Sequence, residues 1–337
     1  MQTARALVAC LLLATAACSK PAASPSTGAA PPASSPLQTA IDAELDTLAR
    51  EPETKEAVVI ALDPNTGEIL AMGGRTGGAS APDLALRAIY PSGSVAKVFS
   101  VAAALETGAV RGSDHFSGAD LSMPGLTISG AAEHPTMSTE DVLVFSSNVG
   151  AARIYEKLGK QRLHDSLVAF GFGQRPPVDG ATTATLGDAS SWSDELATKI
   201  AFGAGLEGTA LQYASAFAAI AAGGQWHAPT REHGKTGATH RVLSSERAAE
   251  ILHLMEGVVH RDDGTGARAR VTGMRVTGKT GTATVDDKVN FASFVGAVPA
   301  EAPRLVVYVG VATSKRGYSG GTIAAPAFAH IVERGFR

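Results

Sequence analysis

A serine and a lysine that could act as nucleophile and base stand three residues apart, at Ser94 and Lys97. A Pro/Ser/Gly turn precedes them and an Ala-rich apolar stretch follows, so we expect a helix to about Glu106. Residues three positions apart share a helix face, which would put the Lys97 amine beside the Ser94 hydroxyl. The helix N-terminus would favour negative charge developing near Ser94. The pair predicts a serine nucleophile with a lysine base, although Ser-x-x-Lys alone also describes a capping serine beside a solvated lysine.

Two later clusters carry groups that would bind a substrate with a carboxylate. The run Lys-Thr-Gly-Thr at 279–282 lies between two strand-like runs, and we expect it to form a lip at the edge of a sheet. There the lysine would supply charge, the threonine a donor, and the glycine close access to the backbone. Ser146 and Asn148 interrupt a helical region, so their hydroxyl and amide would enter a cleft.

The three motifs occur in the order and approximate separation used by penicillin-binding transpeptidases and serine β-lactamases, and the chain resembles that superfamily. The stretches between the motifs are similar to class B penicillin-binding proteins, so the resemblance covers about residues 37–337. The segments that carry it are 59–72, 134–148, 203–212, 221–224, 264–265, 278–283, 294–296 and 320–326.

The resemblance implies an acyl-enzyme mechanism on peptidoglycan stem peptides that end in D-Ala-D-Ala. Ser94 would attack the carbonyl of that peptide bond, and Lys97, neutral in a partly desolvated site, would take its proton. Ser146 would relay a proton to the leaving amine. A β-lactam mimics the peptide and would leave Ser94 acylated.

The resemblance also implies how substrate is held, with no cofactor and no metal. Asn148 would position the peptide amide, and backbone N–H groups of Ser94 and Thr282 would form an oxyanion hole. The residues implied at the terminal carboxylate are Lys279, Thr280, Gly281 and Thr282.

Two departures from the family pattern stand out. Ser92 occupies the place where the family usually has proline before Gly-Ser, which changes the turn. The long N-terminal module that many members carry as a pedestal is not expected before this catalytic domain, so a role that needs it as a docking surface is in doubt.

Strand-like runs occur at both ends of the chain, with helical patterns between them. Runs at 57–62 and 68–72 predict a hairpin across Asp-Pro-Asn-Thr-Gly. The later runs are 274–277, 282–285, 291–295 and 304–309. We therefore expect an α+β fold, in which an antiparallel sheet is flanked by helices and interrupted by an all-helical insert. The resemblance implies the same DD-peptidase/β-lactamase-like fold.

The N-terminus resembles a bacterial lipoprotein signal. Residues 1–18 combine Arg5, a short apolar run and Leu-Ala-Thr-Ala-Ala directly before Cys18, which would be lipidated; a plain signal peptide with a stray cysteine is the alternative. Residues 19–36 are rich in Ala, Pro and Ser and predict a flexible linker, so the catalytic domain would span 37–337. Only Cys10 and Cys18 exist, which leaves the mature domain without a disulfide. The expected location is the periplasmic side of the cell envelope, anchored to either membrane.

Composition and two decoy motifs narrow the alternatives. With 337 residues, a net charge of −3 and no basic cluster, nucleic-acid binding is not expected. The match to G-x-G-x-x-G at 203–208 lacks a preceding strand, and a second Lys-Thr-Gly at 235–237 resembles an exposed hairpin tip. Nine scattered histidines predict no metal site, and Glu44 and its neighbouring carboxylates predict a solvated helix face.

The reaction outcome stays open at this stage. An amine acceptor gives a transpeptidase, which we favour, whereas water gives a D,D-carboxypeptidase or a serine β-lactamase. The chain contains no Glu-x-x-Leu-Asn, the motif that would place a deacylating carboxylate, so a long-lived acyl-enzyme is expected. A non-catalytic penicillin-sensing or peptidoglycan-binding lipoprotein is the alternative outside enzymes. Protein partners cannot be derived.

Overall fold

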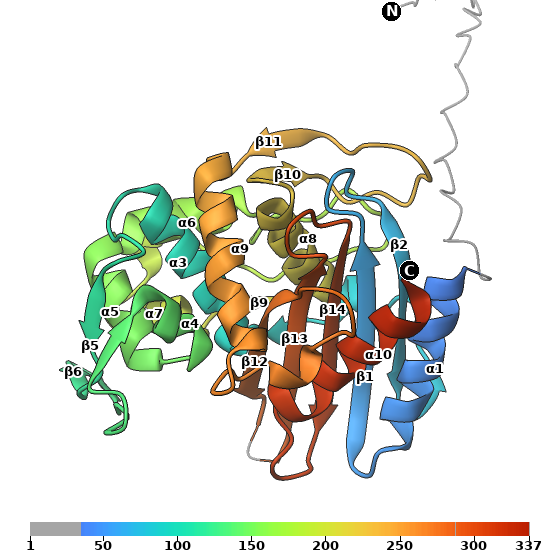
Figure 1. Ribbon diagram of the computed structural model, residues 1–337, viewed down its shortest axis with the longest axis horizontal. Coiled ribbons are helices and arrows are strands. Elements are labelled where there is room, and N and C mark those ends of the chain that lie inside the picture. Colours follow the sequence, from blue (N-terminus) through green and yellow to red (C-terminus); the bar gives the residue numbers. More distant parts are fainter. Residues whose placement is uncertain (1–34, 287, 337) are drawn as a thin grey trace, which may run out of the picture.

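The computed structural model describes residues 35–286 and 288–336. A six-stranded antiparallel sheet forms one half, and most helices gather beside its edge strand β12 (Figure 1). In spatial order the sheet consists of β12 (Thr277–Thr284), β13 (Asn290–Val298), β14 (Leu305–Thr313), β1 (Thr54–Leu62), β2 (Ile69–Thr76) and β3 (Ala79–Ser80). Strand β1 pairs with both β2 and β14, so the two ends of the chain meet in the sheet.

Helices and short turns make up most of the rest. The α-helices are α1 (Pro36–Arg50), α2 (Leu84–Arg87), α3 (Ala96–Glu106), α4 (Thr139–Val144), α5 (Asn148–Leu158), α6 (Lys160–Ala169), α7 (Asp194–Phe202), α8 (Ala210–Ala221), α9 (Ser245–His260) and α10 (Ala325–Gly335). Three short 3₁₀ helices are η1 (Gly93–Val95), η2 (Ala189–Ser191) and η3 (Ala267–Ala269), and a short π-helix is η4 (Gly320–Ala324).

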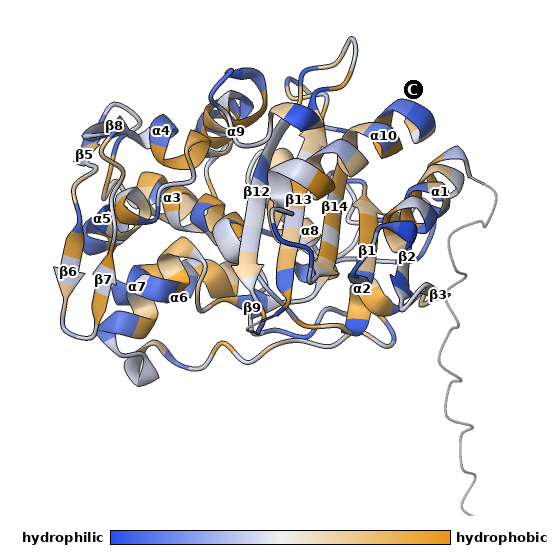
Figure 2. Cartoon of the chain, turned by 90° about the horizontal axis from the view of Figure 1, so that it is seen from below, coloured by the Kyte–Doolittle hydropathy of each residue, from blue (hydrophilic) through white to orange (hydrophobic). Residues whose placement is uncertain are grey.

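The central strands are buried on both faces, so their apolar residues serve two cores. Along β14, Val307 and Val309 belong to the core under α1 and α10, whereas Val306 and Tyr308 belong to the core around α8. Successive strand residues point to opposite faces, and both faces are covered by helices, which explains a continuous apolar run. The hydrophobic stretches of β1, β14 and α3 are visible in Figure 2.

Helix α3 is the centre of the helical half. Every residue from Ala96 to Leu105 is buried, and α5, α6, α7 and α9 pack around it. A helix that is apolar on all sides can only be stable when it is enclosed in this way. Because α3 is enclosed, the residues at its first turn are held in a rigid setting next to β12.

The α+β class, the antiparallel sheet and the 57–72 hairpin are confirmed. The insert also carries short strand pairs, so it is not purely helical: β4 (Tyr90–Pro91) with β9 (Glu207–Gly208), β5 (His115–Ser117) with β8 (Thr136–Ser138), β6 (Leu121–Met123) with β7 (Leu126–Ile128), and β10 (Gln225–His227) with β11 (Thr239–Arg241). The runs expected at 274–277 and 282–285 are not separate strands, because β12 is continuous through the Lys-Thr-Gly motif.

Two details of α1 differ from expectation. The helix begins at Pro36, one residue before the expected domain start, because the Ser35 hydroxyl accepts from the Gln38 amide as an N-cap. Glu44 is 3% exposed and is not on a solvated face. It contacts His330 at 3.1 Å and Arg334 at 3.6 Å, both on α10, and so joins the two helices. Among the described residues, no helix has the length and apolar character needed to cross a membrane.

Candidate active site

The Ser94 and Lys97 side chains meet as their spacing predicts. Ser94 lies in η1, immediately before α3, and Lys97 is in the first turn of that helix. The Lys97 Nζ is 2.6 Å from the Ser94 Oγ, 2.7 Å from Oδ1 of Asn148 and 2.9 Å from the carbonyl oxygen of Phe202. The first and second motifs therefore converge on one amine.

These three contacts suit a neutral lysine acting as a base. A neutral amine has two N–H groups and one lone pair, whereas an ammonium has three N–H groups. The oxygens of Asn148 and Phe202 can only accept, so they take the two N–H groups. In that neutral form, the Ser94 hydroxyl is the group left to donate to the lone pair of Lys97.

Burial supplies the neutral form. Lys97 is fully buried, which lowers its pKa well below the usual 10.5, and the nearby amine of Lys279 lowers it further. Desolvation penalises the charged state and a like charge penalises it again. The site therefore holds Lys97 ready to accept a proton from Ser94.

Ser146 occupies a backbone conformation that is rare for residues with a side chain. Its φ is +59°, at the point where α4 ends. The Ser146 amide donates to the carbonyl of Leu143, and the Ser147 amide to that of Val142. This pair of bonds is a Schellman ending, whose left-handed position usually holds glycine. Serine there costs about 1–2 kcal/mol, so the turn stores strain at a predicted catalytic residue.

Lys279 lies on β12, fully buried beside the second motif. Its Nζ is 2.9 Å from the Ser146 Oγ and 3.1 Å from the carbonyl oxygen of Thr280. Full burial lowers the pKa of Lys279 from 10.5 to about 7. The Thr280 hydroxyl donates to that of Thr265 at 2.9 Å, which extends the row of polar groups. The second motif, Ser146-x-Asn148, and the third motif, Lys279-Thr280-Gly281, are thus joined by a hydrogen bond between side chains.

Gly281 allows close packing in this structure, a role that the sequence analysis did not predict. A Cβ there would lie 2.3 Å from the Ser293 hydroxyl and 2.9 Å from the Ser92 carbonyl oxygen. Gly93, with φ of +50°, faces the same strand, and a Cβ on it would lie 2.8 Å from the Thr282 backbone nitrogen. The two glycines let the Ser94 turn lie directly against β12.

Ser92 makes two bonds where the family usually has proline. Its amide donates to the carbonyl of Leu206 at 2.8 Å, and its hydroxyl to that of Gly203 at 3.3 Å. Proline could make neither bond, because it lacks both groups. The unusual residue therefore ties the nucleophile turn to the segment that follows α7.

Two cavities open on either side of Ser94. Their volumes are about 430 Å³ and about 320 Å³, and both include Ser94 and Thr282 in their walls. The larger is completed by Ser146, Gly264, Thr265, Ala267, Arg268, Thr280, Ser319, Gly321 and Thr322. The smaller is completed by Pro91, Gly93, Asn148, Phe202, Gly203, Ala204, Ala283 and Thr284. The cleft thus extends away from Ser94 in two directions.

Sequence reasoning missed two groups that complete the site. The Phe202 carbonyl cannot be read from a side-chain motif, because it belongs to the last turn of α7; the Gly203 that follows was the available signal. Thr265 was seen only as part of the resemblance and received no role.

Neither decoy motif has the structural context that its usual function requires. The glycines at 203–208 follow helix α7 and not a strand, so the dinucleotide context is absent there. The second Lys-Thr-Gly lies between β10 and β11, with Lys235 exposed, as expected of a hairpin tip. Over 35–286 and 288–336, no three His, Cys, Asp or Glu side chains gather as a metal site. Cys18 and the predicted linker up to residue 34 lie outside the described residues.

Comparison with known proteins places these motifs in context. Residues 57–333 match the family model described as the penicillin binding protein transpeptidase domain. The chain is 31% identical to stage V sporulation protein D of Bacillus subtilis, covering 88% of this chain and 52% of that protein. It is 30% identical to the probable peptidoglycan D,D-transpeptidase FtsI of Caulobacter vibrioides, covering 88% and 56%. The chain therefore spans about half the length of these relatives.

Solved structures give the same result for the fold. The transpeptidase domain of penicillin-binding protein 3 from Burkholderia pseudomallei superposes with a TM-score of 0.79 at 29% identity, covering 88% of this chain and 92% of that one. A protein from Burkholderia ambifaria described as a peptidoglycan glycosyltransferase superposes with a TM-score of 0.80 at 28% identity, covering 88% and 93%.

Proposed function

The chain belongs to the penicillin-binding protein transpeptidase family, and from this we propose that it is a serine D,D-transpeptidase acting on D-Ala-D-Ala stem peptides of peptidoglycan. The observation that carries the proposal is the buried Lys97 amine, 2.6 Å from the Ser94 hydroxyl, with two acceptor-only oxygens at its N–H groups. Relatives named as probable peptidoglycan D,D-transpeptidases support the same reaction.

In the acylation step, the Ser94 Oγ attacks the carbonyl carbon between the two D-alanines while its proton passes to Lys97. The backbone N–H groups of Ser94 and Thr282 stabilise the oxyanion, supported by the close approach of the Gly93 turn to the Thr282 backbone. When the C–N bond breaks, the leaving D-alanine amine gains a proton through Ser146. Its contact with Lys279 at 2.9 Å supports that role.

Substrate binding uses both sides of Ser94. Thr280 and Thr282 line the larger cavity, where most wall residues carry a hydroxyl group, and with the buried Lys279 they would hold the terminal carboxylate. Asn148 lines the smaller cavity, which suits its proposed contact with the peptide amide of the donor. The acceptor amine would then enter from the side that D-alanine has left.

The walls of the cleft favour transfer to an amine over hydrolysis. None of the described residues that line either cavity is Asp or Glu. A carboxylate base for deacylation by water is therefore not among these residues, and a positioned base contributes about 10²–10⁴-fold to such a step. An acyl group on Ser94 should consequently persist until an amine arrives, as a transpeptidase requires.

Intact mass after addition of benzylpenicillin, followed over time, tests the proposal. We expect one added penicilloyl group that persists for minutes to hours, and none in Ser94→Ala. Absence of any adduct on the wild-type protein would remove the catalytic proposal and leave a peptidoglycan-binding lipoprotein. Turnover faster than about one per second would instead identify a β-lactamase, because typical enzyme turnover lies in or above that range.

We also propose a lipid anchor in the cell envelope. The signal-like residues 1–18, Cys18 and the Ala/Pro/Ser-rich stretch before α1 support the anchor. A relative named as a probable peptidoglycan D,D-transpeptidase suits a place in the cell envelope. Expression of the full chain with a labelled fatty acid tests the anchor. Label on the wild-type protein but not on Cys18→Ser is expected, and label on neither would refute the anchor.

A further inference from the structure

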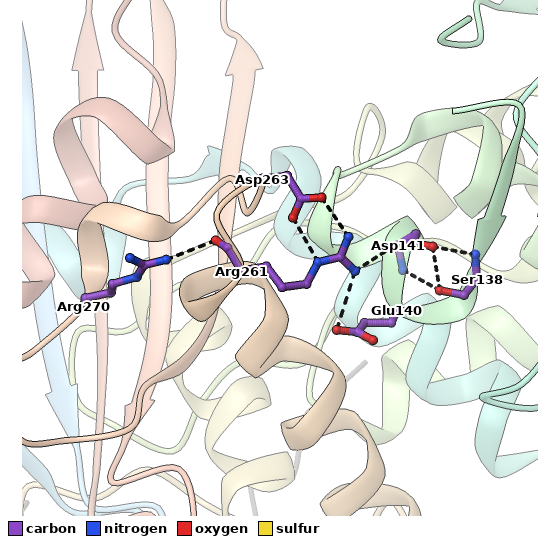
Figure 3. Close-up of polar contacts among 6 residues, drawn as sticks. All are labelled: Ser138, Glu140, Asp141, Arg261, Asp263 and Arg270. Carbon is purple, nitrogen blue, oxygen red and sulfur yellow. Dashed lines mark hydrogen bonds and ion pairs between the residues drawn. The ribbon is translucent and has the colours of Figure 1, made fainter. Parts of the chain in front are cut away.

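Arg261 joins two parts of the cleft that are distant in the sequence. It follows α9 directly, and its guanidinium reaches the first turn of α4 (Figure 3). The Nε and Nη2 atoms donate to both carboxylate oxygens of Asp263, at 2.9 and 2.8 Å, while Nη1 donates to Asp141 at 2.7 Å. Glu140 lies 3.8 Å from the same Nη1. Only a forked guanidinium can serve two carboxylates in this way.

The α4 side of this contact is itself well ordered. Asp141 accepts from the backbone amide of Ser138 at 3.0 Å and from its hydroxyl at 2.8 Å, which completes a capping box. Burial opposes ionisation of Asp141, but the hydrogen bonds from Ser138 and Arg261 outweigh it and lower its pKa. The carboxylate that receives Arg261 is therefore fixed and charged at neutral pH.

The other end of α4 carries the strained serine. The Phe145 ring contacts two groups. It stacks on the His134 ring, with 3.8 Å between the two centroids, and the Arg261 guanidinium carbon is 5.2 Å from the centroid of the Phe145 ring. Ser146 is the next residue. Arg261 thus contacts both the first turn of α4 and the residue that leads into the left-handed turn.

The α9 side leads to the carboxylate-binding wall. The carbonyl of Arg261 accepts from the amide of Gly264, and the amide of Thr265 donates to Val144 at the end of α4. Thr265 in turn accepts from Thr280 of the third motif. One short loop, from Arg261 to Thr265, consequently connects the Ser146 turn with the wall that faces it.

We propose that Arg261 is a positioning residue for the reaction: its guanidinium holds the α4 turn against the 261–265 loop, so that the Ser146 hydroxyl stays within hydrogen-bonding distance of Lys279. The inference rests on the proposed function. Since Ser146 has a strained backbone, the turn needs support from outside the helix, and Arg261 supplies it from α9.

The test compares acylation by fluorescent penicillin in Arg261→Ala, Arg261→Lys and wild type, with rates normalised to the titrated active sites. We expect the second-order acylation constant to fall about ten- to a hundredfold in Arg261→Ala, because small displacements of a catalytic group have effects of this size. Arg261→Lys keeps the charge but not the fork, so its constant should lie between the two.

A background of Ser146→Ala separates positioning from simple stability. If Arg261 acts through Ser146, adding Arg261→Ala to the Ser146→Ala variant should leave its residual acylation constant unchanged. Arg261→Ala should still lower the melting temperature in both backgrounds, because the ion pairs of Arg261 are lost in both. The matched control is Arg275→Ala, whose guanidinium binds Glu256 on the same α9 but contacts no motif residue; its acylation constant should equal that of wild type.

An unchanged per-site constant in Arg261→Ala, or the same fold-loss in both backgrounds, would overturn the inference. Either result would leave the proposed function standing, because the wild-type protein would still be acylated. Failure of the wild type to acylate at all would instead count against the proposed function.

Discussion

The two amine–hydroxyl pairs of the cleft are built in opposite ways. Ser94 and Lys97 lie three residues apart, in the 3₁₀ turn η1 and in the first turn of α3 that continues it, and their 2.6 Å contact follows from helical geometry. Ser146 and Lys279 lie 133 residues apart, on a strained turn and on an edge strand, and meet at 2.9 Å. The first pair depends on local structure, whereas the second depends on the packing of the insert against the sheet.

This difference assigns separate tasks to the two pairs. A pair fixed within one helix keeps its geometry even when neighbouring elements move, which suits a nucleophile and its base. A pair that spans two elements can respond to what enters the cleft between them, which suits proton relay and substrate binding. Substitutions in the first pair should accordingly change mainly the rate of acylation. Substitutions in the second pair should change the rate of acylation, the pH dependence of stability and the backbone strain at Ser146.

The largest effect is expected for the local pair. Lys97→Met keeps a side chain of similar length but removes the base, so the acylation constant should fall about 10²–10⁴-fold. The measurement is the time course of labelling by fluorescent penicillin. Lys199→Met, on the surface of α7 and paired with Glu195, is the control and should label at the wild-type rate. Rapid labelling of Lys97→Met would show that another group activates Ser94.

The same contrast explains what the sequence could and could not predict. The Ser94–Lys97 contact needs only one helix, so spacing and composition were sufficient. The separate roles of Ser146 and Lys279 came from the family resemblance, but their contact was not predicted, since periodicity carries no information about pairs so far apart. The Phe202 carbonyl and the Arg261 guanidinium were missed, because one is a main-chain group and the other a side chain without a motif.

For two single residues, Glu44 and Gly281, the sequence did not reveal the neighbours that pack against them in the fold. Glu44 has the spacing of a solvated helix face, but α10 returns from the far end of the chain and covers it with His330 and Arg334. Gly281 was assigned to substrate access, and its second role, packing against the Ser92 turn, was not predicted. In both cases the decisive neighbour comes from a distant part of the sequence.

A second prediction uses the buried amine of the distant pair. The pKa of Lys279 is about 7 in the folded protein and about 10.5 in the unfolded chain. Between these values the unfolded chain binds more protons, so Lys279 makes the free energy of unfolding rise with pH, by up to about 1.4 kcal/mol per unit. This contribution is complete above 10.5 and is lost as pH falls through 7.

Urea denaturation between pH 7 and pH 10 measures this contribution. The difference in unfolding free energy between wild type and Lys279→Met should increase steadily with pH, because methionine cannot titrate. Lys235→Met, at an exposed loop, should run parallel to wild type. If the unfolding free energy of Lys279→Met also ran parallel to that of wild type across this pH range, Lys279 would stay charged when buried. Its hydrogen bond with Ser146 would then be one made by an ammonium group.

The smallest effect concerns the backbone of Ser146, and it separates strain from chemistry. Both Ser146→Gly and Ser146→Ala lose the hydroxyl, so both should lose the relay and acylate slowly. Glycine relieves the left-handed conformation at φ of +59° and alanine does not, so Ser146→Gly should be more stable by about 1 kcal/mol.

Thermal and urea unfolding of the two variants measure the difference, and Ser166 supplies a control of opposite sign. Ser166 lies inside α6, where glycine should be less stable than alanine by about 0.8–1.0 kcal/mol. Equal stability of the two Ser146 variants would mean that the turn relaxes once the hydroxyl is gone. A more stable glycine variant would instead mean that the packing of α4 imposes the strain, and that the chain retains serine at this position at a cost in stability because the distant pair needs its hydroxyl.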